Sequence, residues 1–459
     1  MNQGLVAIVG RPNVGKSTLF NRLTKTKNAI IHDRPGVTRD RLYGTVSSVD
    51  EDGSGYSIID TGGFETKDLY YQPFAKNIVW EQTQMAIEES DLVLLVLDAK
   101  AGLHPHDREL VQYLKKIQKK VIYVANKVDG QEQSPSMWEF YELGVDDVLT
   151  CSAAHNRGIW DLSCAIEEIL ESEQGQLNQT PQEEGATKIA LIGRPNAGKS
   201  SILNRLCGEN RSLVSDVAGT TRDTVDTLIS YNKKPFVLLD TAGVRRRKKI
   251  YDKLEGLMVI KSLRAIEDAD IVVIVITAES GMSDQDARLA SLAASKYKPI
   301  LIVVNKWDLI ENKDTNTAKE YELDLRDKLA DIAYFPVIFT SCLENKRVHK
   351  ILQEIEGLSE AYNKRASTSR INEVLEKAVH EHTPALVRKY NKRVKFYYAT
   401  QVRTMPPTIV VKCNVAGEIQ ESYKRYLTKR FRRDLEFGKT PLRVLFRGKK
   451  EEKEFQEKS

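Results

Sequence analysis

Two short segments of the chain combine glycines with a lysine and a serine at a spacing that suits a phosphate ligand. Each reads Gly-x-x-x-x-Gly-Lys-Ser, a pattern whose glycines let backbone N–H groups close around phosphate oxygens. A helix that begins at the lysine would add its partial positive charge. The first phosphate loop comprises Gly10, Arg11, Pro12, Asn13, Val14, Gly15, Lys16 and Ser17, and the second comprises Gly193, Arg194, Pro195, Asn196, Ala197, Gly198, Lys199 and Ser200.

Further residues that suit a nucleotide and Mg²⁺ follow each loop in the same order. The lysine would reach the β- and γ-phosphates, and the serine would bind Mg²⁺. A later threonine could add a hydroxyl to Mg²⁺, an aspartate could hold Mg²⁺ through water, and a glycine could present its N–H to the γ-phosphate. The loop that carries the threonine and the loop that carries the aspartate and the glycine are candidate switches. These residues are Lys16, Ser17, Thr38, Asp60 and Gly63 in the first set, with Thr61 and Gly62 between the last two, and Lys199, Ser200, Thr221, Asp240 and Gly243 in the second, with Thr241 and Ala242.

A third motif, Asn-Lys-x-Asp, indicates which base is read. An ionised aspartate accepts two hydrogen bonds from N1–H and the 2-amino group of guanine, and adenine offers neither donor. A later backbone N–H could contact O6 of guanine, after Ser152 and Ser341. The motifs are Asn126, Lys127, Val128 and Asp129 with Ser152 and Ala153, and Asn305, Lys306, Trp307 and Asp308 with Ser341 and Cys342.

The recurrence of all these motifs in one order indicates a duplicated domain. Apolar runs that alternate with helical stretches predict buried parallel strands, and each motif follows a strand, where an open α/β sheet places its ligand. The predicted strands are Leu5–Val9, Ser57–Ile59, Leu92–Leu97 and Val121–Ala125, then Ile189–Ile192, Phe236–Leu239, Ile271–Ile276 and Ile300–Val304. We therefore expect a first GTP-binding copy at 1–172, a linker at 173–186 and a second copy at 187–359.

The remainder of the chain predicts a small basic α+β domain at 360–448 and a charged tail at 449–459. Its expected order is α-β-β-α-β: helices at Ile371–His382 and Gln420–Leu435, and strands at Val394–Thr400, Thr408–Asn414 and Leu442–Phe446. Residues 361–459 hold 24 Lys and Arg against 11 Asp and Glu, whereas the whole chain has a net charge of +5. This asymmetry favours a polyanionic partner, but a solvated surface or docking on the acidic body stays open.

Composition narrows the class of protein further. Of the 459 residues, 41% are hydrophobic and 29% charged, which is typical of globular proteins. The longest apolar runs are too short to cross a bilayer, and no secretory signal is expected. Five scattered cysteines fit reduced thiols better than disulfides or zinc. We expect a cytoplasmic monomer without a membrane partner.

The ordered motifs resemble those of the Ras-like P-loop GTPases. Two such domains followed by a small basic domain resemble the bacterial double GTPases of the Der (EngA) family, related to TrmE and Era. This resemblance covers about residues 4–447. It implies a fold of two tandem GTPase domains plus a KH-like domain, GTP and GDP as ligands, and Mg²⁺-dependent hydrolysis of GTP. It also implies a role in large-subunit ribosome assembly, with the subunit and its rRNA as partners.

Three departures qualify the resemblance. Ras-like enzymes orient the attacking water with a glutamine, but Phe64 and Val244 stand at those positions, which implies slow intrinsic turnover or water positioning by other groups. Asn13 and Asn196 resemble asparagines that bind an activating K⁺ in related GTPases; alternatively they brace the loop. Residues 361–459 lack Gly-x-x-Gly, the backbone clamp of KH modules, so RNA would have to meet basic surface.

That surface is expected on one face of the last helix. Its candidates are Lys424, Arg425, Lys429, Arg430, Arg432 and Arg433, and the last three are expected to be exposed. Tyr397 and Tyr398 could stack on bases, although alternation predicts that at least one lies in the core. The run Arg245–Lys249 is either a solvated loop or a nucleotide-dependent contact.

Two other functions stay open from the sequence. One is a protein-binding scaffold whose basic domain docks on the acidic GTPase body. The other is a K⁺-dependent GTPase of tRNA modification or membrane transport, which is disfavoured because neither a modification domain nor a membrane segment is evident.

Overall fold

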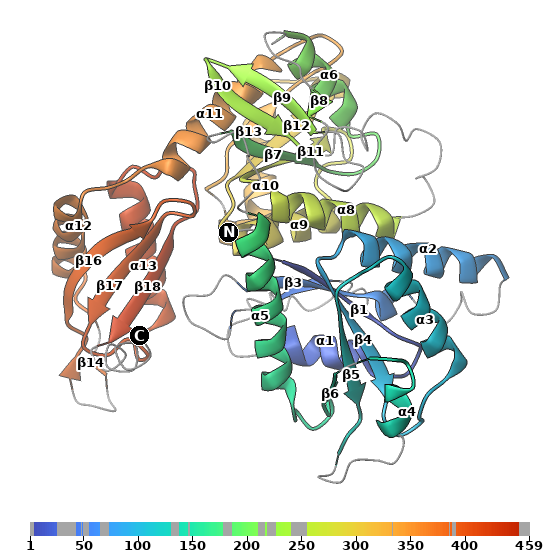
Figure 1. Cartoon of the computed structure of the whole chain (residues 1–459). Helices are drawn as coiled ribbons and strands as arrows, with labels where there is room; N and C mark the ends of the chain where they lie inside the picture. The colour runs from blue at the N-terminus through green and yellow to red at the C-terminus, as the bar shows by residue number, and fades with distance from the viewer. Residues whose placement is uncertain are drawn as a thin grey trace. The chain divides into compact units, whose positions relative to one another are not determined.

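The computed structural model describes residues 4–24, 43–46, 48, 55–64, 73–129, 137–145, 147–177, 186–209, 216–217, 226–239, 255–332, 334–384, 386–387 and 392–448. The chain forms two compact units (Figure 1). The first comprises Met1–Glu184 with Arg247–Asp268, and the second comprises Gly185–Arg246 with Ala269–Ser459.

The first unit is built on a mixed sheet in the order β2-β3-β1-β4-β5-β6. All neighbours are parallel except β2, which runs antiparallel to β3. Apolar residues of α1 and α5 share one core with β1 and β4, because alternate residues of a strand face opposite sides of a sheet. The elements are β1 (Leu5–Val9), α1 (Lys16–Thr24), β2 (Tyr43–Val46), β3 (Tyr56–Asp60), η1 (Thr61–Phe64), α2 (Pro73–Glu89), β4 (Leu92–Asp98), α3 (Pro105–Lys116), β5 (Val121–Asn126), α4 (Met137–Tyr141), β6 (Val148–Thr150), α5 (Ile159–Leu177) and α8 (Glu255–Asp268).

The second unit repeats this sheet in the order β13-β12-β11-β7-β10-β9-β8. Here β9 runs antiparallel to both β8 and β10, and β10 joins the parallel part through β7. The elements of this repeat are β7 (Thr187–Ile192), α6 (Lys199–Glu209), β8 (Asp216–Val217), β9 (Asp226–Tyr231), β10 (Lys234–Leu238), β11 (Ile271–Thr277), α9 (Asp284–Ser295), β12 (Ile300–Asn305), η3 (Trp307–Leu309), α10 (Thr317–Lys328), η4 (Ala330–Ile332), β13 (Val337–Phe339) and α11 (His349–Asn363). The eight predicted strands are confirmed.

The C-terminal domain has the predicted α-β-β-α-β order. Its sheet, β16-β17-β18, packs through one face on α12 and α13, around Ile409, Val411 and Phe431. A short hairpin of β14 and β15 precedes it and was not predicted. The elements are α12 (Thr368–Glu381), β14 (Leu386–Val387), β15 (Lys392–Arg393), β16 (Phe396–Arg403), β17 (Thr408–Cys413), α13 (Glu421–Asp434) and β18 (Arg443–Gly448).

Helix α8 belongs to the second copy in sequence but to the first unit in space. It packs against α2, and the Arg264 guanidinium lies 2.7 Å from both oxygens of Asp91. Helix α5 also continues to Leu177, inside the predicted linker. The compact units thus cut the chain differently from the predicted boundaries, which follow the sequence repeat and stay a prediction.

Candidate nucleotide-binding sites

The two phosphate loops have the same backbone shape. Gly10, Asn13 and Gly15 have φ values of 149°, 65° and 99°, and the equivalent Gly193, Asn196 and Gly198 have 143°, 59° and 95°. A Cβ at Gly10 would lie 2.5 Å from the Val96 carbonyl oxygen. Glycine is therefore required there by both the left-handed conformation and the contact with β4.

The lysine of each loop is held across its own loop. Lys16 Nζ donates to the carbonyl oxygens of Gly10 at 2.8 Å and Arg11 at 2.9 Å. Lys199 Nζ makes the same bonds at 2.6 and 2.7 Å. Burial lowers the pKa of Lys199 to about 8. Each ammonium group thus spans the loop interior that would face a phosphate chain.

Asp60 brings together the predicted Mg²⁺ ligands of the first copy. Its carboxylate accepts hydrogen bonds from the Ser17 hydroxyl and, at 2.9 Å, from the Gly62 N–H. Burial raises the pKa of Asp60, and those two hydrogen bonds together with the Lys16 charge oppose the rise. Gly62 is packed so tightly that a Cβ would lie 2.9 Å from Lys16 Cε. A hydroxyl, a carboxylate and an ammonium group at one point suit Mg²⁺ with a phosphate.

The base motif is tied to the phosphate loop in both copies. Asn126 Nδ2 donates to the Val14 carbonyl oxygen at 2.9 Å, and Asn305 Nδ2 donates to that of Ala197 at 2.9 Å. Asn126 Oδ1 also accepts the Ala153 N–H at 3.0 Å. That N–H was expected to contact guanine O6, so such a contact would have to share the donor.

The base-reading aspartate of the first copy accepts hydrogen bonds from one ammonium group and one hydroxyl group. Asp129 accepts hydrogen bonds from Lys100 Nζ at 2.6 Å and Ser152 Oγ at 2.7 Å, and both lower its pKa. Strand pairing places Glu279 of the second copy where the first has Lys100. The surroundings of Asp308 therefore carry the opposite charge at that position.

Sequence reasoning missed an ion pair behind each phosphate loop. Arg11 Nε lies 3.5 Å from Asp107 Oδ2, and Arg194 Nε lies 3.2 Å from Asp286 Oδ2. Both aspartates are buried and close capping boxes, with His104 at α3 and Ser283 at α9. The Ser-x-x-Asp spacing before α9 was a usable signal for that helix start, although nothing local pointed to the arginine.

Several predicted site residues lie outside the described residues. They are Thr38, Thr221, Asp240, Thr241, Ala242, Gly243, Val244 and the run Arg245–Lys249. The backbone of Gly63 and Phe64 forms the end of η1, after Asp60.

The expected basic face of α13 needs correction. Arg430 is bound to both oxygens of Glu381 and to Asp434, with its side chain only 15% exposed. The Arg432 guanidinium lies 4.1 Å from the centre of the Tyr334 ring, and Arg433 pairs with Asp434. Arg433 is exposed as expected, with its side chain 66% exposed, and Arg425 and Lys429 are exposed as well. The prediction of exposure is wrong for Arg430 and Arg432, because the helix packs on the second GTPase body and on α12.

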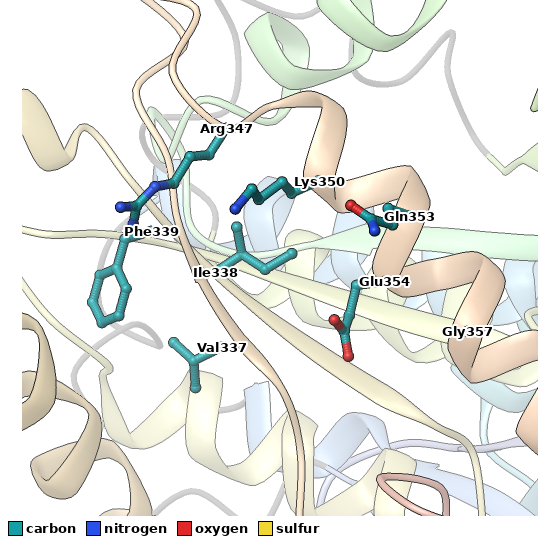
Figure 2. A pocket seen from close by; sticks show the side chains of 8 residues that line it. All are labelled: Val337, Ile338, Phe339, Arg347, Lys350, Gln353, Glu354 and Gly357. Atoms are coloured by element: carbon teal, nitrogen blue, oxygen red, sulfur yellow. The ribbon is translucent and has the colours of Figure 1, made fainter.

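That packing involves two more cations of the C-terminal domain. Lys439 Nζ bonds Glu354 of α11 at 2.7 Å, and Arg443 lies 5.8 Å from the centre of the Tyr297 ring. A pocket of about 440 Å³ opens beside Glu354 (Figure 2). It is lined by Val337, Ile338, Phe339, Arg347, Lys350, Gln353, Glu354 and Gly357, none of which belongs to the nucleotide motifs.

Comparisons with known proteins agree with this geometry. The family of 50S ribosome-binding GTPases matches residues 5–127 and 188–306, and the KH-domain-like family of EngA bacterial GTPases matches 365–447. GTPase Der of Geobacter metallireducens is 44% identical over 97% of this chain and 98% of its own length. GTPase Der of Syntrophotalea carbinolica is 45% identical over 96% and 98%. Among solved structures, Aquifex aeolicus Era bound to GDP and aluminium fluoride covers 57% of this chain and 92% of its own, at 21% identity and a TM-score of 0.30.

These comparisons agree on the family of the chain. A GTPase model matches twice, the model of the EngA C-terminal domain matches once, and the relatives are similar over nearly their whole length. No helix in the described ranges is long and apolar enough to span a membrane. Nucleotide in a P-loop GTPase is bound with Mg²⁺. The chain belongs to the GTPase Der (EngA) family of tandem GTPases, which hydrolyse GTP and act in ribosome assembly by binding the 50S subunit.

Proposed function

We propose that this chain is a cytoplasmic, monomeric switch whose two GTP sites control its affinity for rRNA of the maturing large subunit. Mg²⁺ would be held by Ser17, Thr38 and Asp60 in the first site and by the equivalent Ser200, Thr221 and Asp240 in the second. GTP would be read by Asp129 and Asp308. The C-terminal domain would supply the contact with rRNA.

The observation that carries the proposal is the pair of bonds from Asn126 to Val14 and from Asn305 to Ala197. Each bond joins the loop that reads the base to the loop that holds the phosphates, with the asparagine 2% exposed. A correctly bound base would therefore help to position the triphosphate, whose γ-phosphate would contact the switch glycines. In this proposal, guanine recognition and γ-phosphate sensing are therefore coupled within each copy.

Potassium activation is a finer part of the proposal. The backbone of Asn13 and Asn196 is held in the left-handed region, and both side chains are exposed at the mouth of the loop. No hydrogen bond of either side chain is seen among the described residues, which disfavours the bracing role. An amide oxygen there could join phosphate oxygens around K⁺, at a site that lacks the usual glutamine.

A protein-binding role keeps one observation in its favour. Arg432, Lys439 and Arg443 contact the second GTPase body, so part of the basic domain already serves docking within the chain. The rRNA proposal must therefore rest on other cations, such as Arg425 and Lys429.

Co-sedimentation with 50S particles tests the proposal. The full chain should pellet with particles differently when loaded with a GTP analogue and with GDP, and the association should weaken log-linearly with salt because phosphate contacts release counterions. A chain ending at Asn363 should keep GTP binding and lose the particles. This end point keeps α11 whole, including buried Tyr362. Equal binding in both nucleotide states, or retained binding by the truncated chain, would favour the protein-partner alternative.

A further inference from the structure

Two neighbouring tyrosines on strand β16 both face solvent. Tyr397 is 44% exposed and Tyr398 is 47% exposed, although adjacent side chains of a regular strand point to opposite faces. The expectation that at least one lies in the core is therefore wrong. Phe396 takes the inner position instead and stacks on Tyr423 with ring centres 5.9 Å apart and planes 5° from parallel.

A β-bulge explains this double exposure. Phe396 pairs with Cys413 and Tyr398 pairs with Lys412, so Tyr397 is an extra residue opposite a single step of β17. A bulge re-aims side chains and is over-represented at sheet edges and beside functional sites. The strand is at the edge of the β16-β17-β18 sheet, where such bulges are common.

Cations surround this tyrosine pair. Lys395 Nζ lies 6.0 Å from the centre of the Tyr397 ring. Tyr398 is in register with Lys412, and Lys412 is in register with Arg447 of β18, so the three share one face of the sheet. The three strands contain no Asp or Glu. The far end of β18 differs, because Arg443 there lies against Tyr297 of the second GTPase body.

We propose that Tyr397 and Tyr398, with Lys395, Lys412 and Arg447, form a site for unpaired RNA nucleotides. Bases would stack on the tyrosine rings, which accept any base because each has a π-face, and the cations would neutralise the adjoining phosphates. The site rests on the proposed rRNA function and gives it a location other than α13. It also supplies what the missing Gly-x-x-Gly clamp does not: a means of holding single-stranded segments of a folded RNA.

The charge of the site decides between RNA and other occupants. An apolar peptide would not need three cations, and an acidic peptide would not need two adjacent aromatic faces. Aromatic faces with interleaved cations match a chain that alternates flat bases with phosphates. RNA is therefore the occupant to test, with an acidic polymer as the competing outcome.

The test uses the full chain and a labelled hairpin RNA with a single-stranded uridine loop, against a fully paired duplex of equal length. Tyr397→Ala and Tyr398→Ala should each weaken loop binding about tenfold and leave duplex binding within twofold. Tyr397→Phe and Tyr398→Phe should restore it, because the ring and not the hydroxyl stacks. Lys412→Gln and Arg447→Gln should each reduce the salt slope by about one.

Tyr141→Ala is the matched control, since this tyrosine of α4 is also 44% exposed and should not affect RNA. Unchanged loop affinity in the Tyr397→Ala/Tyr398→Ala variant, or equal losses for loop and duplex, overturns the site. Binding of polyglutamate with the same tyrosine dependence also overturns it, in favour of an acidic protein. Co-sedimentation of the same variant with 50S particles separates the two proposals: nucleotide-dependent pelleting without any tyrosine effect on loop RNA refutes this site alone.

Discussion

Asp129 and Asp308 occupy equivalent positions but differ in what surrounds them. Lys100 and Ser152 each donate to a separate oxygen of Asp129, and a carboxylate can accept about four bonds. Both oxygens thus retain a place for a guanine donor while the carboxylate stays oriented. In the second copy, Glu279 replaces Lys100, so this orientation must come from elsewhere.

Substituting the base-reading aspartate should change the nucleotide specificity of its own site. Asp129→Asn and Asp308→Asn should each weaken GTP binding at their own site by about 10- to 100-fold, the range for losing hydrogen bonds to a charged group. Each should favour xanthosine nucleotide, whose 2-oxo group accepts. Equilibrium binding with labelled GTP, xanthosine triphosphate and ATP measures the change. ATP binding equal to GTP binding by the unmodified chain would contradict the base assignment.

The exposed loop asparagines lead to a cation prediction. GTP turnover should rise when K⁺ replaces Na⁺, and Asn13→Ala or Asn196→Ala should bring the ratio of rates toward one at its own site. GDP binding should be spared, because the backbone cradle is unchanged. Steady-state phosphate release in the two salts measures this, with Lys16→Ala and Lys199→Ala as variants that lose nucleotide in either salt. Identical rates for the unmodified chain in both salts would remove K⁺ from the mechanism.

At the scale of elements, buried strands were predictable and their edges were not. Leu92–Leu97 and Ile271–Ile276 are covered on both faces, so the apolar run is continuous and marks the strand. Short, half-buried β2 carries no such run. The bulge at Tyr397 depends on pairing with β17, a partner that alternation within β16 cannot reveal.

The site was predictable to a similar degree. The phosphate and base motifs were predictable because each one recurs in both copies with its internal spacing intact and directly follows an apolar strand. The exposure of the α13 cations was not predictable, because Arg430 pairs with Glu381 and Arg432 stacks on Tyr334, and both partners are distant in sequence. Arg11 with Asp107 was missed for the same reason.

The cap of α3 gives a prediction of pH dependence. Burial raises the pKa of Asp107, despite the His104 N–H bond and the Arg11 charge. A carboxyl whose folded pKa is raised contributes stability that is complete below the unfolded value of about 3.9 and is lost as the pH rises through the folded pKa. Asp107→Asn removes this titration but can keep the cap acceptor. The unmodified chain should therefore gain stability relative to this variant as the pH falls through that window.

Urea unfolding of both proteins from pH 7 to pH 4 measures the difference. Glu168→Gln, at an exposed position of α5, is the control and should show no such trend. A difference in free energy of unfolding that is constant with pH would contradict the assignment.

At the scale of the molecule, the basic charge of the C-terminal domain is divided between two uses. Arg432→Glu should lower the free energy of unfolding of the second unit by about 1–2 kcal/mol, because a cation–π contact is worth about 0.5–2 kcal/mol and the new charge would face the half-buried Tyr334 ring. Arg425→Glu should change stability by less than about 0.5 kcal/mol, as exposed sites do. Differential scanning fluorimetry and urea unfolding measure both. The opposite ranking would mean that Arg432 does not fasten the domain.

The placement of α8 leads us to predict that the two nucleotide sites are interdependent. This helix follows the second copy's Asp240–Gly243 segment, yet Arg264 anchors it to Asp91, beside the helix that follows Asp60–Gly63. The first copy has Met85 at the place of Arg264. Loading xanthosine triphosphate into the first site of an Asp129→Asn chain should change GTP affinity at the second by about 5- to 150-fold, and Arg264→Met should abolish the change. A GTP affinity at the second site that does not depend on the nucleotide in the first site would disprove this coupling.

Such a connection obeys reciprocity. Whatever factor GTP at the second site imposes on the first, GTP at the first must impose on the second, since both describe one thermodynamic cycle. Two duplicated sites that began as independent copies would then have four occupancy states with unequal free energies. A partner that binds one of these four states best would then respond to the combination of nucleotides that the chain holds, and not to either site alone.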